Sequence, residues 1–474
     1  MNRLLFLALV LMVACAPKED KTLITGTIDN PVTEHFQIIY QKDFISGERE
    51  TLEITLDENN SFQTEVDITK DIVPAHLIIE EEDLITIFLE PGIDIHITAD
   101  GDDIKGTLAF SGTNADNSTF LLEYSQKLDD KFQQQQQVFE KIRSLNPAEF
   151  YEYAEDMKNT KLKLFEKLSE DKELSNNFKN YFKTNIKFDY YDKLTNYPNY
   201  HMMLNQLAEE PELPENYYHY IEAALESLSD EKLTTASYRN FLNSYISYYK
   251  KQNPDKVPEE KSHYEQNIYL AEKLYEGKNL EYLKAYYIFH KFNFGEFEKA
   301  TEYYETFLEE QPDEEYITIL SSIYETTKKL LPGNPAPEFE LTDLKGDTVS
   351  LEDFRGKVVY LDFWASWCGP CMREVPYAKE LKNRFKDEED LVFVYISLDE
   401  DLEAWRNTIE AQKMEGVHLK TGGWDHDVPK SYNVKGVPSY FIIDRNGNMF
   451  DNNAKRPSSE GIDDDLRAAL ELVS

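Results

Sequence analysis

The sequence predicts a chain of several domains: an N-terminal all-β sandwich or barrel, a central α-helical region and a C-terminal α/β domain. Its 474 residues exceed the length of an ordinary single domain. Short alternating apolar runs give way to a helical period, and a proline- and glycine-rich break at 331–337 precedes alternating strands and helices. We expect a β-rich domain over 22–113, a helical region over 114–330 and an α/β domain over 331–474.

The β-rich domain is predicted from short runs of strand-forming residues separated by turn-forming tracts. Several of these runs alternate apolar with polar residues, as in half-buried strands. The tract 57–60, Asp-Glu-Asn-Asn, lies between two such runs and indicates a hairpin. The predicted strands are 23–28, 36–40, 52–56, 62–66, 77–80, 84–89 and 93–98. Together they favour a small antiparallel sandwich or barrel.

In the central region the apolar pattern takes a helical period. Asn146 followed by Pro147 and Glu149 supplies a cap, a proline at the first helical position and a carboxylate in the first turn. Of the 31 tyrosines, 24 lie between 151 and 330, and aromatic residues at helical spacing are more often packed than ligand-binding. The segment that begins at Gly295 resembles one tetratricopeptide repeat. Because such repeats need neighbours of the same period, we expect a single irregular bundle instead.

The C-terminal section predicts a mixed sheet covered by helices on both faces. Its predicted strands are 358–363, 391–396, 416–419 and 439–443, with a last strand after the turn at 444–447. Its predicted helices are 370–385, 402–413, 428–432 and 458–473.

Composition limits the classes of partner and cofactor. With 90 acidic and 50 basic residues the formal net charge is −40, which repels phosphate backbones, so we expect no nucleic-acid partner. Hydrophobic residues make up 41% of the chain, enough for packed cores. There are three cysteines, Cys15, Cys368 and Cys371, and the nine histidines are scattered. A structural zinc site needs four ligands, so we expect no metal and no other cofactor.

The N-terminus carries an export signal. Arg3 precedes the apolar run 4–14, which is too short to span a bilayer as a helix. The run ends in small residues before Cys15 and resembles a bacterial lipoprotein box, which implies that 1–15 is a signal peptide with a lipidated cysteine. The alternative is a simple secretory signal with an incidental cysteine. The tract 18–20, Lys-Glu-Asp, looks like the one that directs some Bacteroidetes lipoproteins to the cell surface. We therefore expect a lipid anchor in the cell envelope, facing the periplasm or exposed at the surface.

The segment 361–371 carries the chemistry. An apolar strand runs straight into a helix whose N-terminus presents Cys368, followed after Gly369 and Pro370 by Cys371. Free N–H groups and the positive end of the helix dipole stabilise a thiolate there, so we expect Cys368 to be the attacking nucleophile. Cys371 lies within disulfide reach and can resolve a mixed disulfide. The alternatives are a structural disulfide, which gains little entropy from so small a loop, and half of a metal site.

Neighbouring residues fit redox use of this pair. Asp362 lies at a core-facing place in the strand, where a carboxylate is costly unless it has a role. We expect it to accept a proton from Cys371; the alternative is a solvated acid at a strand end. A cis Pro438 beside the disulfide would leave the Val437 backbone free to pair with an extended substrate chain, whereas the alternative is an ordinary trans turn. Trp367 offers an apolar contact surface for a client.

These motifs resemble thioredoxin: Trp-Cys-Gly-Pro-Cys at 367–371, Asp362, and Gly-Val-Pro at 436–438. The resemblance covers about 330–474 and implies a C-terminal thioredoxin fold. It also implies that Gly369 and Pro370 tune the redox potential, because this dipeptide resembles that of reducing thioredoxins. One departure is Tyr395, which the sequence offers where thioredoxins carry a lysine near the buried acid.

Further motifs narrow the resemblance. Cys-Met-Arg-Glu-Val-Pro at 371–376, Pro-Ala-Pro-Glu-Phe at 335–339 and Leu-Asp-Glu at 398–400 resemble the TlpA/ResA branch. Its members are exported, membrane-anchored thiol-disulfide oxidoreductases related to the AhpC/TSA group. Residues 22–330 resemble the β-rich and helical region that precedes such modules in Bacteroidetes lipoproteins, and no activity comes with that likeness.

The leading hypothesis is therefore a thiol-disulfide oxidoreductase that acts as a reductase on exported proteins with thiols or disulfides. It would need a membrane electron donor or acceptor, and relatives that reduce apocytochromes imply a part in cytochrome c maturation or redox homeostasis. A thiol peroxidase is an alternative, but the threonine and proline of a Pro-x-x-x-Thr-x-x-Cys setting are missing before Cys368. A second alternative is a lipoprotein whose residues 22–330 recruit a partner or ligand, with a secondary redox module.

Overall fold

The computed structural model describes residues 21–68, 73–78, 84–128, 133–294 and 297–472. The predicted lipidation site Cys15 and the export signal lie outside the described residues. The chain divides after Lys284 into two compact units, each described by itself below. Within the described residues, no helix is long and apolar enough to cross a membrane.

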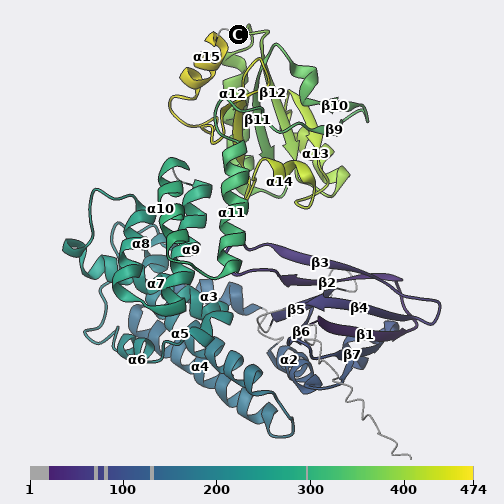
Figure 1. Cartoon of the computed structure of the whole chain (residues 1–474), viewed down its shortest axis with the longest axis vertical. Helices are drawn as coiled ribbons and strands as arrows, with labels where there is room; N and C mark the ends of the chain where they lie inside the picture. Colours follow the sequence, from purple (N-terminus) through teal and green to yellow (C-terminus); the bar gives the residue numbers. More distant parts are fainter. Residues whose placement is uncertain (1–20, 69–72, 79–83, 129–132, 295–296, 473–474) are drawn as a thin grey trace, which may run out of the picture. The chain divides into compact units, whose positions relative to one another are not determined.

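The first unit begins with two four-stranded sheets, in the strand orders β4-β1-β7-β8 and β3-β2-β5-β6 (Figure 1). Side chains from both sheets share one buried apolar cluster, as in a sandwich. The strands are β1 (Lys21–Asp29), β2 (His35–Gln41), β3 (Arg49–Thr55), β4 (Ser61–Asp67), β5 (Val73–Ile78), β6 (Leu84–Leu89), β7 (Ile95–Asp100) and β8 (Ala109–Ser111). The predicted all-β sandwich is confirmed.

Three details of this sandwich differ from the prediction, and the first is the three-residue strand β8, which the sequence did not predict. β1 and β7 pair in parallel, because the intervening strands form a long connection that brings the chain back in the same direction. β5 begins at Val73, whereas the predicted start was residue 77. The prediction missed the first residues because Pro74 and His76 interrupt the apolar pattern, although both lie in the ladder with β6.

Helices follow, as predicted. They are α1 (Ile104–Thr107), α2 (Ala115–Leu128), α3 (Gln133–Ser144), α4 (Pro147–Ser169), α5 (Asn176–Leu204), α6 (Tyr220–Glu226), α7 (Ala236–Gln252), α8 (His263–Leu274) and α9 (Gly277–Phe294). The cap expected at Asn146 forms a complete capping box with Glu149 at the start of α4. Tyrosines serve as packing residues: Tyr197 stacks on Phe150, with ring centres 4.3 Å apart, and both are fully buried.

The second unit begins within α9, at Ala285, and contains α10 (Phe297–Glu309) and α11 (Glu314–Lys329), followed by an α/β domain. Its strands are β9 (Glu340–Asp343), β10 (Thr348–Ser350), β11 (Val358–Trp364), β12 (Leu391–Ser397), β13 (Val417–Lys420), β14 (Ser439–Ile443) and β15 (Met449–Asp451). Its helices are α12 (Gly369–Arg384), α13 (Leu402–Gln412), α14 (Asp427–Ser431) and α15 (Ile462–Glu471). The seven strands form one sheet in the order β10-β9-β13-β12-β11-β14-β15.

This sheet confirms the predicted mixed α/β domain. β11, β12 and β13 are parallel to one another. β14 pairs antiparallel with β11, and β15 pairs antiparallel with β14, so β15 runs in the direction of β11. The β9–β10 hairpin was not predicted, because its strands are too short to show a period. α15 starts later than the predicted residue 458, because Gly461, at φ +86°, adopts a left-handed conformation directly before it.

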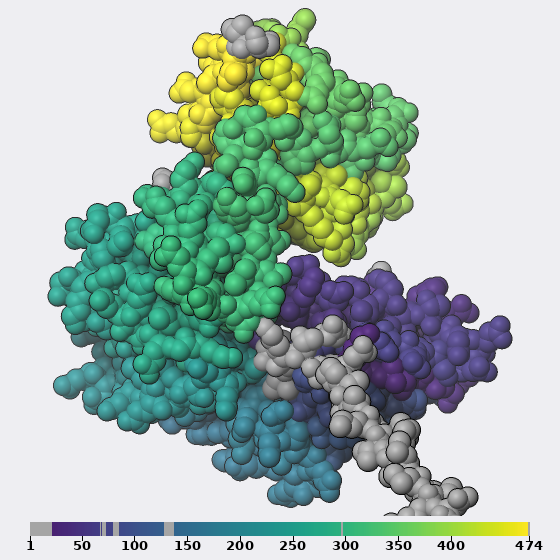
Figure 2. All heavy atoms as spheres, viewed as in Figure 1, coloured from purple at the N-terminus to yellow at the C-terminus, as the bar shows by residue number. Residues whose placement is uncertain are grey.

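Helices cover both faces of the sheet. Asp362 and Phe363 are consecutive in β11 and so point to opposite faces. On the Phe363 face, Tyr432 packs against Phe363 and Phe441 at the end of α14, while α12 covers the Asp362 face. In the space-filling view the yellow C-terminal residues lie beside green residues from earlier in the same domain (Figure 2), and Arg384 of α12 hydrogen-bonds Asp463 of α15.

Candidate active site

The parallel strands bring three chain segments to one edge of the sheet. β11, β12 and β13 end at Trp364, Ser397 and Lys420, and the loops that follow leave the sheet at the same side. The carboxyl-terminal edge of parallel strands is where α/β proteins commonly place their functional groups. The first of these loops leads to both redox cysteines.

Cys368 is the N-cap residue of α12, with Gly369 and Pro370 as the first two helical residues. The Cys371 amide N–H donates to Cys368 Sγ over 3.1 Å. A helix N-terminus offers unsatisfied N–H donors and a positive partial charge. Proline is tolerated there because no intrahelical N–H is lost. This position therefore stabilises a thiolate at Cys368 when the pair is reduced.

Cys368 and Cys371 form a disulfide in this structure, with an S–S distance of 2.03 Å. Cys368 is only 4% exposed, whereas the adjacent Trp367 is 59% exposed. The Val437–Pro438 peptide bond is cis, as expected from the sequence. The Val437 carbonyl oxygen lies 3.5 Å from Cys368 Sγ. The structure thus brings Val437 to the reactive sulfur.

Asp362 lies fully inside the domain, on the α12 face of the central strand. In register it faces Tyr395 on β12 and Tyr440 on β14, and its Oδ1 atom has no hydrogen-bond partner among the described residues. Burial, together with the nearby Glu374 carboxylate, raises the pKa of Asp362 well above its ordinary value. A carboxyl group with a raised pKa keeps its proton to higher pH and is a better proton acceptor when ionised. Tyr395, which the sequence offers where thioredoxins carry a lysine, thus lies beside Asp362.

Glu374 is a buried acid to which the sequence reasoning assigned no role. It lies on α12 one turn beyond Cys371 and accepts hydrogen bonds from the Ser458 backbone N–H, at 3.1 Å, and hydroxyl, at 2.8 Å. Because residues three apart share a helix face, its spacing from Cys371 was a usable signal. Its charge contributes to the raised pKa of Asp362.

Asp399 is a second acid without a predicted role. It is 1% exposed, in the loop after β12. Its carboxylate accepts the Ser366 backbone N–H at 2.9 Å and the hydroxyl groups of Ser366 and Ser397, each at 2.5 Å. Asp399 therefore fixes the loop between β11 and Cys368. In the sequence, Asp399 contributed only to the Leu-Asp-Glu motif at 398–400, which carried a family resemblance but assigned no role to this residue.

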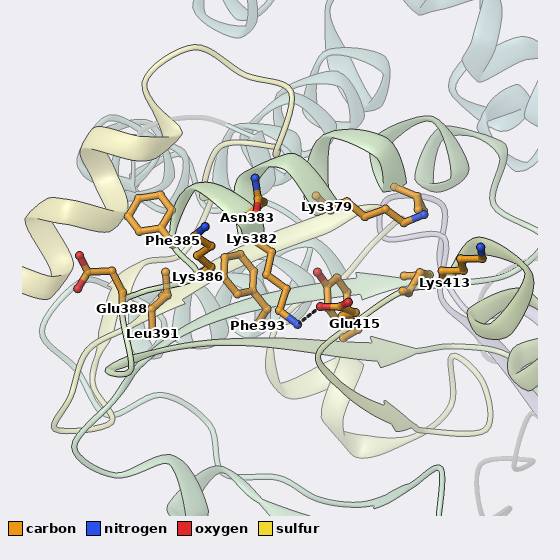
Figure 3. Close-up of a pocket in the computed structure, with 14 residues that line it drawn as sticks. Lys379, Lys382, Asn383, Phe385, Lys386, Glu388, Leu391, Phe393, Lys413 and Glu415 are labelled. Carbon is orange, nitrogen blue, oxygen red and sulfur yellow. Dashed lines mark hydrogen bonds and ion pairs between the residues drawn. The ribbon is translucent and has the colours of Figure 1, made fainter.

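A cavity of about 470 Å³ opens on the α12 face (Figure 3). Lys379, Lys382 and Lys413 lie at its rim, and Phe393 and Tyr395 belong to its lining. An ion pair between Lys382 and Glu415, at 3.2 Å, joins two of the lining residues. Neither cysteine lines this cavity, so it is distinct from the redox pair.

The arrangement supports dithiol–disulfide exchange. The disulfide-bonded Cys368 and Cys371 and the buried Asp362 carboxyl group lie within one strand–helix connection. Among the described residues there is no group of three or more His, Cys, Asp or Glu side chains that could hold a metal ion. Exchange by the two sulfurs needs no cofactor.

Comparisons with known proteins give matches over the C-terminal part of the chain. The family model described as Redoxin matches residues 331–470. The thiol-disulfide oxidoreductase ResA of Bacillus cereus is 31% identical over 151 residues, which cover 32% of this chain and 85% of the relative. ResA of Geobacillus kaustophilus is 34% identical over 134 residues, covering 28% of this chain and 74% of the relative.

Solved structures give matches over a similar share of the chain. A putative thiol-disulfide oxidoreductase from Bacteroides vulgatus is 35% identical, with a TM-score of 0.28, and covers 30% of this chain and 98% of that one. A putative thiol:disulfide interchange protein DsbE from Chlorobium tepidum is 33% identical, with a TM-score of 0.27. The match covers 30% of this chain and 99% of that one.

Proposed function

Because the chain belongs, through its C-terminal domain, to the Redoxin family as a ResA-like thiol-disulfide oxidoreductase, we propose that it reduces disulfides of exported proteins. The observation that carries the proposal is the Cys368–Cys371 disulfide at the N-terminus of α12, beside the buried Asp362. A dithiol placed in this way forms a thiolate and offers its electrons to a second disulfide.

The reaction proceeds in two exchanges. The Cys368 thiolate attacks a client disulfide, whose S–S bond breaks; one client sulfur leaves as a thiolate and takes a proton from solvent. Cys371 then gives its proton to the Asp362 carboxylate, and its sulfur attacks Cys368. The bond between Cys368 and the client breaks, and the second client sulfur leaves as a thiolate that takes the proton back from Asp362. The client has gained two electrons, and the Cys368–Cys371 disulfide seen here remains. Val437, Pro438 and Trp367 hold the client segment near the sulfur, and Gly369 and Pro370 set the potential.

We place this reaction in the cell envelope, with the chain anchored through lipid on Cys15 and facing the periplasm. The motif before Cys15 supports this placement. A membrane electron donor would return two electrons to the pair after each cycle. The ResA likeness of the C-terminal domain supports thiol-disulfide exchange. Exported clients, including apocytochromes, are what the TlpA/ResA resemblance of the sequence motifs implies.

The direction is tested by the reduction potential of residues 16–474, equilibrated in defined thiol buffers and measured by mass spectrometry. A potential of about −250 mV or lower supports a reductase, whereas about −120 to −180 mV would make the protein an oxidant or isomerase and contradict the proposed direction.

The roles of the two cysteines are tested by substitution. We expect Cys368→Ser to abolish insulin reduction, and Cys371→Ser to accumulate a mixed disulfide because resolution is lost. Equal accumulation of mixed disulfide in both variants would overturn these assignments.

A further inference from the structure

A second tryptophan, Trp424, lies beside the site on a loop that the proposed mechanism does not use. The loop follows β13, and the Trp424 ring centre lies 6.5 Å from that of Trp367. Trp424 is 38% exposed, and Trp367 is more exposed still. Large aromatic surfaces bury much apolar area when a partner covers them, and tryptophan is enriched at binding hot spots. The two rings, here called the tryptophan pair, therefore offer an apolar surface directly before Cys368.

The loop that presents Trp424 is fixed by the neighbouring strand. The Thr421 backbone N–H and hydroxyl both donate to the Ser397 carbonyl oxygen, at 2.9 and 3.1 Å. Gly423 has φ +123°, and a Cβ there would lie 3.0 Å from the Glu400 carboxylate. Only glycine adopts this conformation without strain. The backbone that leads to Trp424 is therefore anchored to the neighbouring strand before any partner arrives, which lowers the entropic cost of binding.

The two tryptophans reach the site from different strands. Trp367 follows β11 and Trp424 follows β13, with β12 between these strands in the sheet. The Val437 carbonyl oxygen lies 3.5 Å from Cys368 Sγ. A client segment bonded to Cys368 thus has a backbone partner at the sulfur and an apolar surface next to it.

Acidic groups border the tryptophan pair. The Asp425 side chain is 97% exposed and pairs with Lys430 at 3.5 Å. The Glu400 carboxylate lies next to the backbone of Gly423. Negative charges at the rim of an interface disfavour a partner of the same sign. The surface therefore suits an apolar side chain and opposes an acidic one.

We propose that Trp424 is a specificity-determining residue that, with Trp367, binds an apolar side chain adjacent to the client's reacting cysteine. The proposal rests on the proposed function, because it names the class of client segment that the same site takes. The sequence alone did not indicate Trp424, since its proximity to Trp367 depends on the order of the strands.

The test uses the reduced full-length protein and three disulfide-linked peptides of equal length, with leucine, serine or aspartate next to the cysteine. Hydroxyethyl disulfide serves as a small substrate without side chains. We expect wild type to react with the leucine peptide about tenfold faster than with the serine peptide, as loss of a contact worth about 1.4 kcal/mol would imply. The aspartate peptide should react slowest.

The decisive variant is Trp424→Ala. It should lose the preference for leucine over serine, keep the wild-type rate with hydroxyethyl disulfide, and keep the wild-type reduction potential. Trp424→Phe should retain part of the preference. Tyr377→Ala, which removes another exposed aromatic ring on α12, is the matched control and should retain all of it.

The outcomes separate the two proposals. An unchanged leucine preference in Trp424→Ala, or an equal fall with all substrates, would overturn the role of Trp424 alone. If wild type reacts with the small disulfide but shows an oxidising potential, the proposed direction fails while the preference test still stands.

Discussion

At the residue scale, the most informative side chain is Asp362. Its carboxyl group is buried against Tyr395 and Tyr440, and burial raises its pKa well above the ordinary 3.8. In the unfolded chain the group ionises near its ordinary pKa, whereas in the folded chain it ionises only at higher pH. Stability is therefore lost as the pH rises through this window. The acid is kept at a cost in folding free energy, which fits a role in proton exchange.

We predict that Asp362→Asn stabilises the protein relative to wild type at pH 8. At pH 4 the stabilisation should be much smaller. The gain should amount to about 1.4 kcal/mol for each unit by which folding raises the pKa. Urea unfolding at the two pH values measures it. The exposed Asp387→Asn is the control, and an equal effect of Asp362→Asn at both pH values would contradict the shifted pKa.

Glu374 allows a second prediction at this scale. Glu374→Gln removes a negative charge that raises the pKa of Asp362, so the pKa of Asp362 should fall. The rate at which Cys371 releases a client from the mixed disulfide depends on pH, and the midpoint of this dependence should then move to lower pH. Stopped-flow measurements of release from a preformed mixed disulfide, made over a range of pH, determine the midpoint. Ser458→Ala, which removes one hydrogen bond to Glu374 but keeps its charge, should leave the midpoint near that of wild type.

The sequence allowed the residues of local motifs to be predicted. Cys368, Cys371 and Asp362 lie within one strand–helix connection, where spacing and helix geometry define their chemistry. Glu374 lies equally near in sequence, but nothing in the sequence indicates that Ser458, far along the chain, buries and holds it. Roles that depend on such distant contacts could not be predicted.

At the scale of single elements, the loop between β11 and α12 depends on Asp399. Asp399→Ala removes the acceptor for the Ser366 N–H and for two hydroxyl groups. We predict a loss of about 1–3 kcal/mol in unfolding free energy, because the loop's donors lose their buried partner. Chemical denaturation measures this loss.

The matched control is Asp401→Ala, in the same acidic loop. Asp401 caps α13 through the Glu403 and Ala404 N–H groups, so its loss should cost about 1 kcal/mol. Only Asp399→Ala should also slow insulin reduction. Equal slowing by both variants would mean that Asp399 has no special part in holding the active-site loop.

Elements with a clear period were predicted well, and those set by pairing partners were not. β11, β12 and α12 have apolar patterns that fit their environment, and the structure has them within a residue or so of the predicted bounds. The parallel pairing of β1 with β7 depends on which distant strand lies alongside, and local sequence carries no such information.

At the scale of the whole chain, every described residue in the buried apolar cluster of the α/β domain lies at or after Leu330. A fragment of residues 330–474 should therefore fold alone. We expect a cooperative urea transition and full activity with hydroxyethyl disulfide. A fragment with native-like secondary structure but no cooperative transition would contradict this.

The same fragment tests whether residues 22–330 recruit clients. If they do, the fragment should reduce insulin normally, whereas the fragment with Cys371→Ser should fail to capture clients that the full chain with Cys371→Ser captures. Unchanged client turnover after this deletion would reject recruitment. The sequence predicted a sandwich and a helical region here, but neither pattern carries a reactive motif that could indicate a role.

The short strands at both borders of the seven-stranded sheet have a consequence for the proposed reduction of client disulfides. β10 and β15 each have three residues and occupy the two outer positions. A chain with opened disulfides exposes segments that readily add as strands to long, flat edges and then aggregate. Because β10 and β15 are so short, they offer few backbone N–H and C=O groups with which such a segment could pair. A client reduced in the proposed way would therefore leave still able to fold.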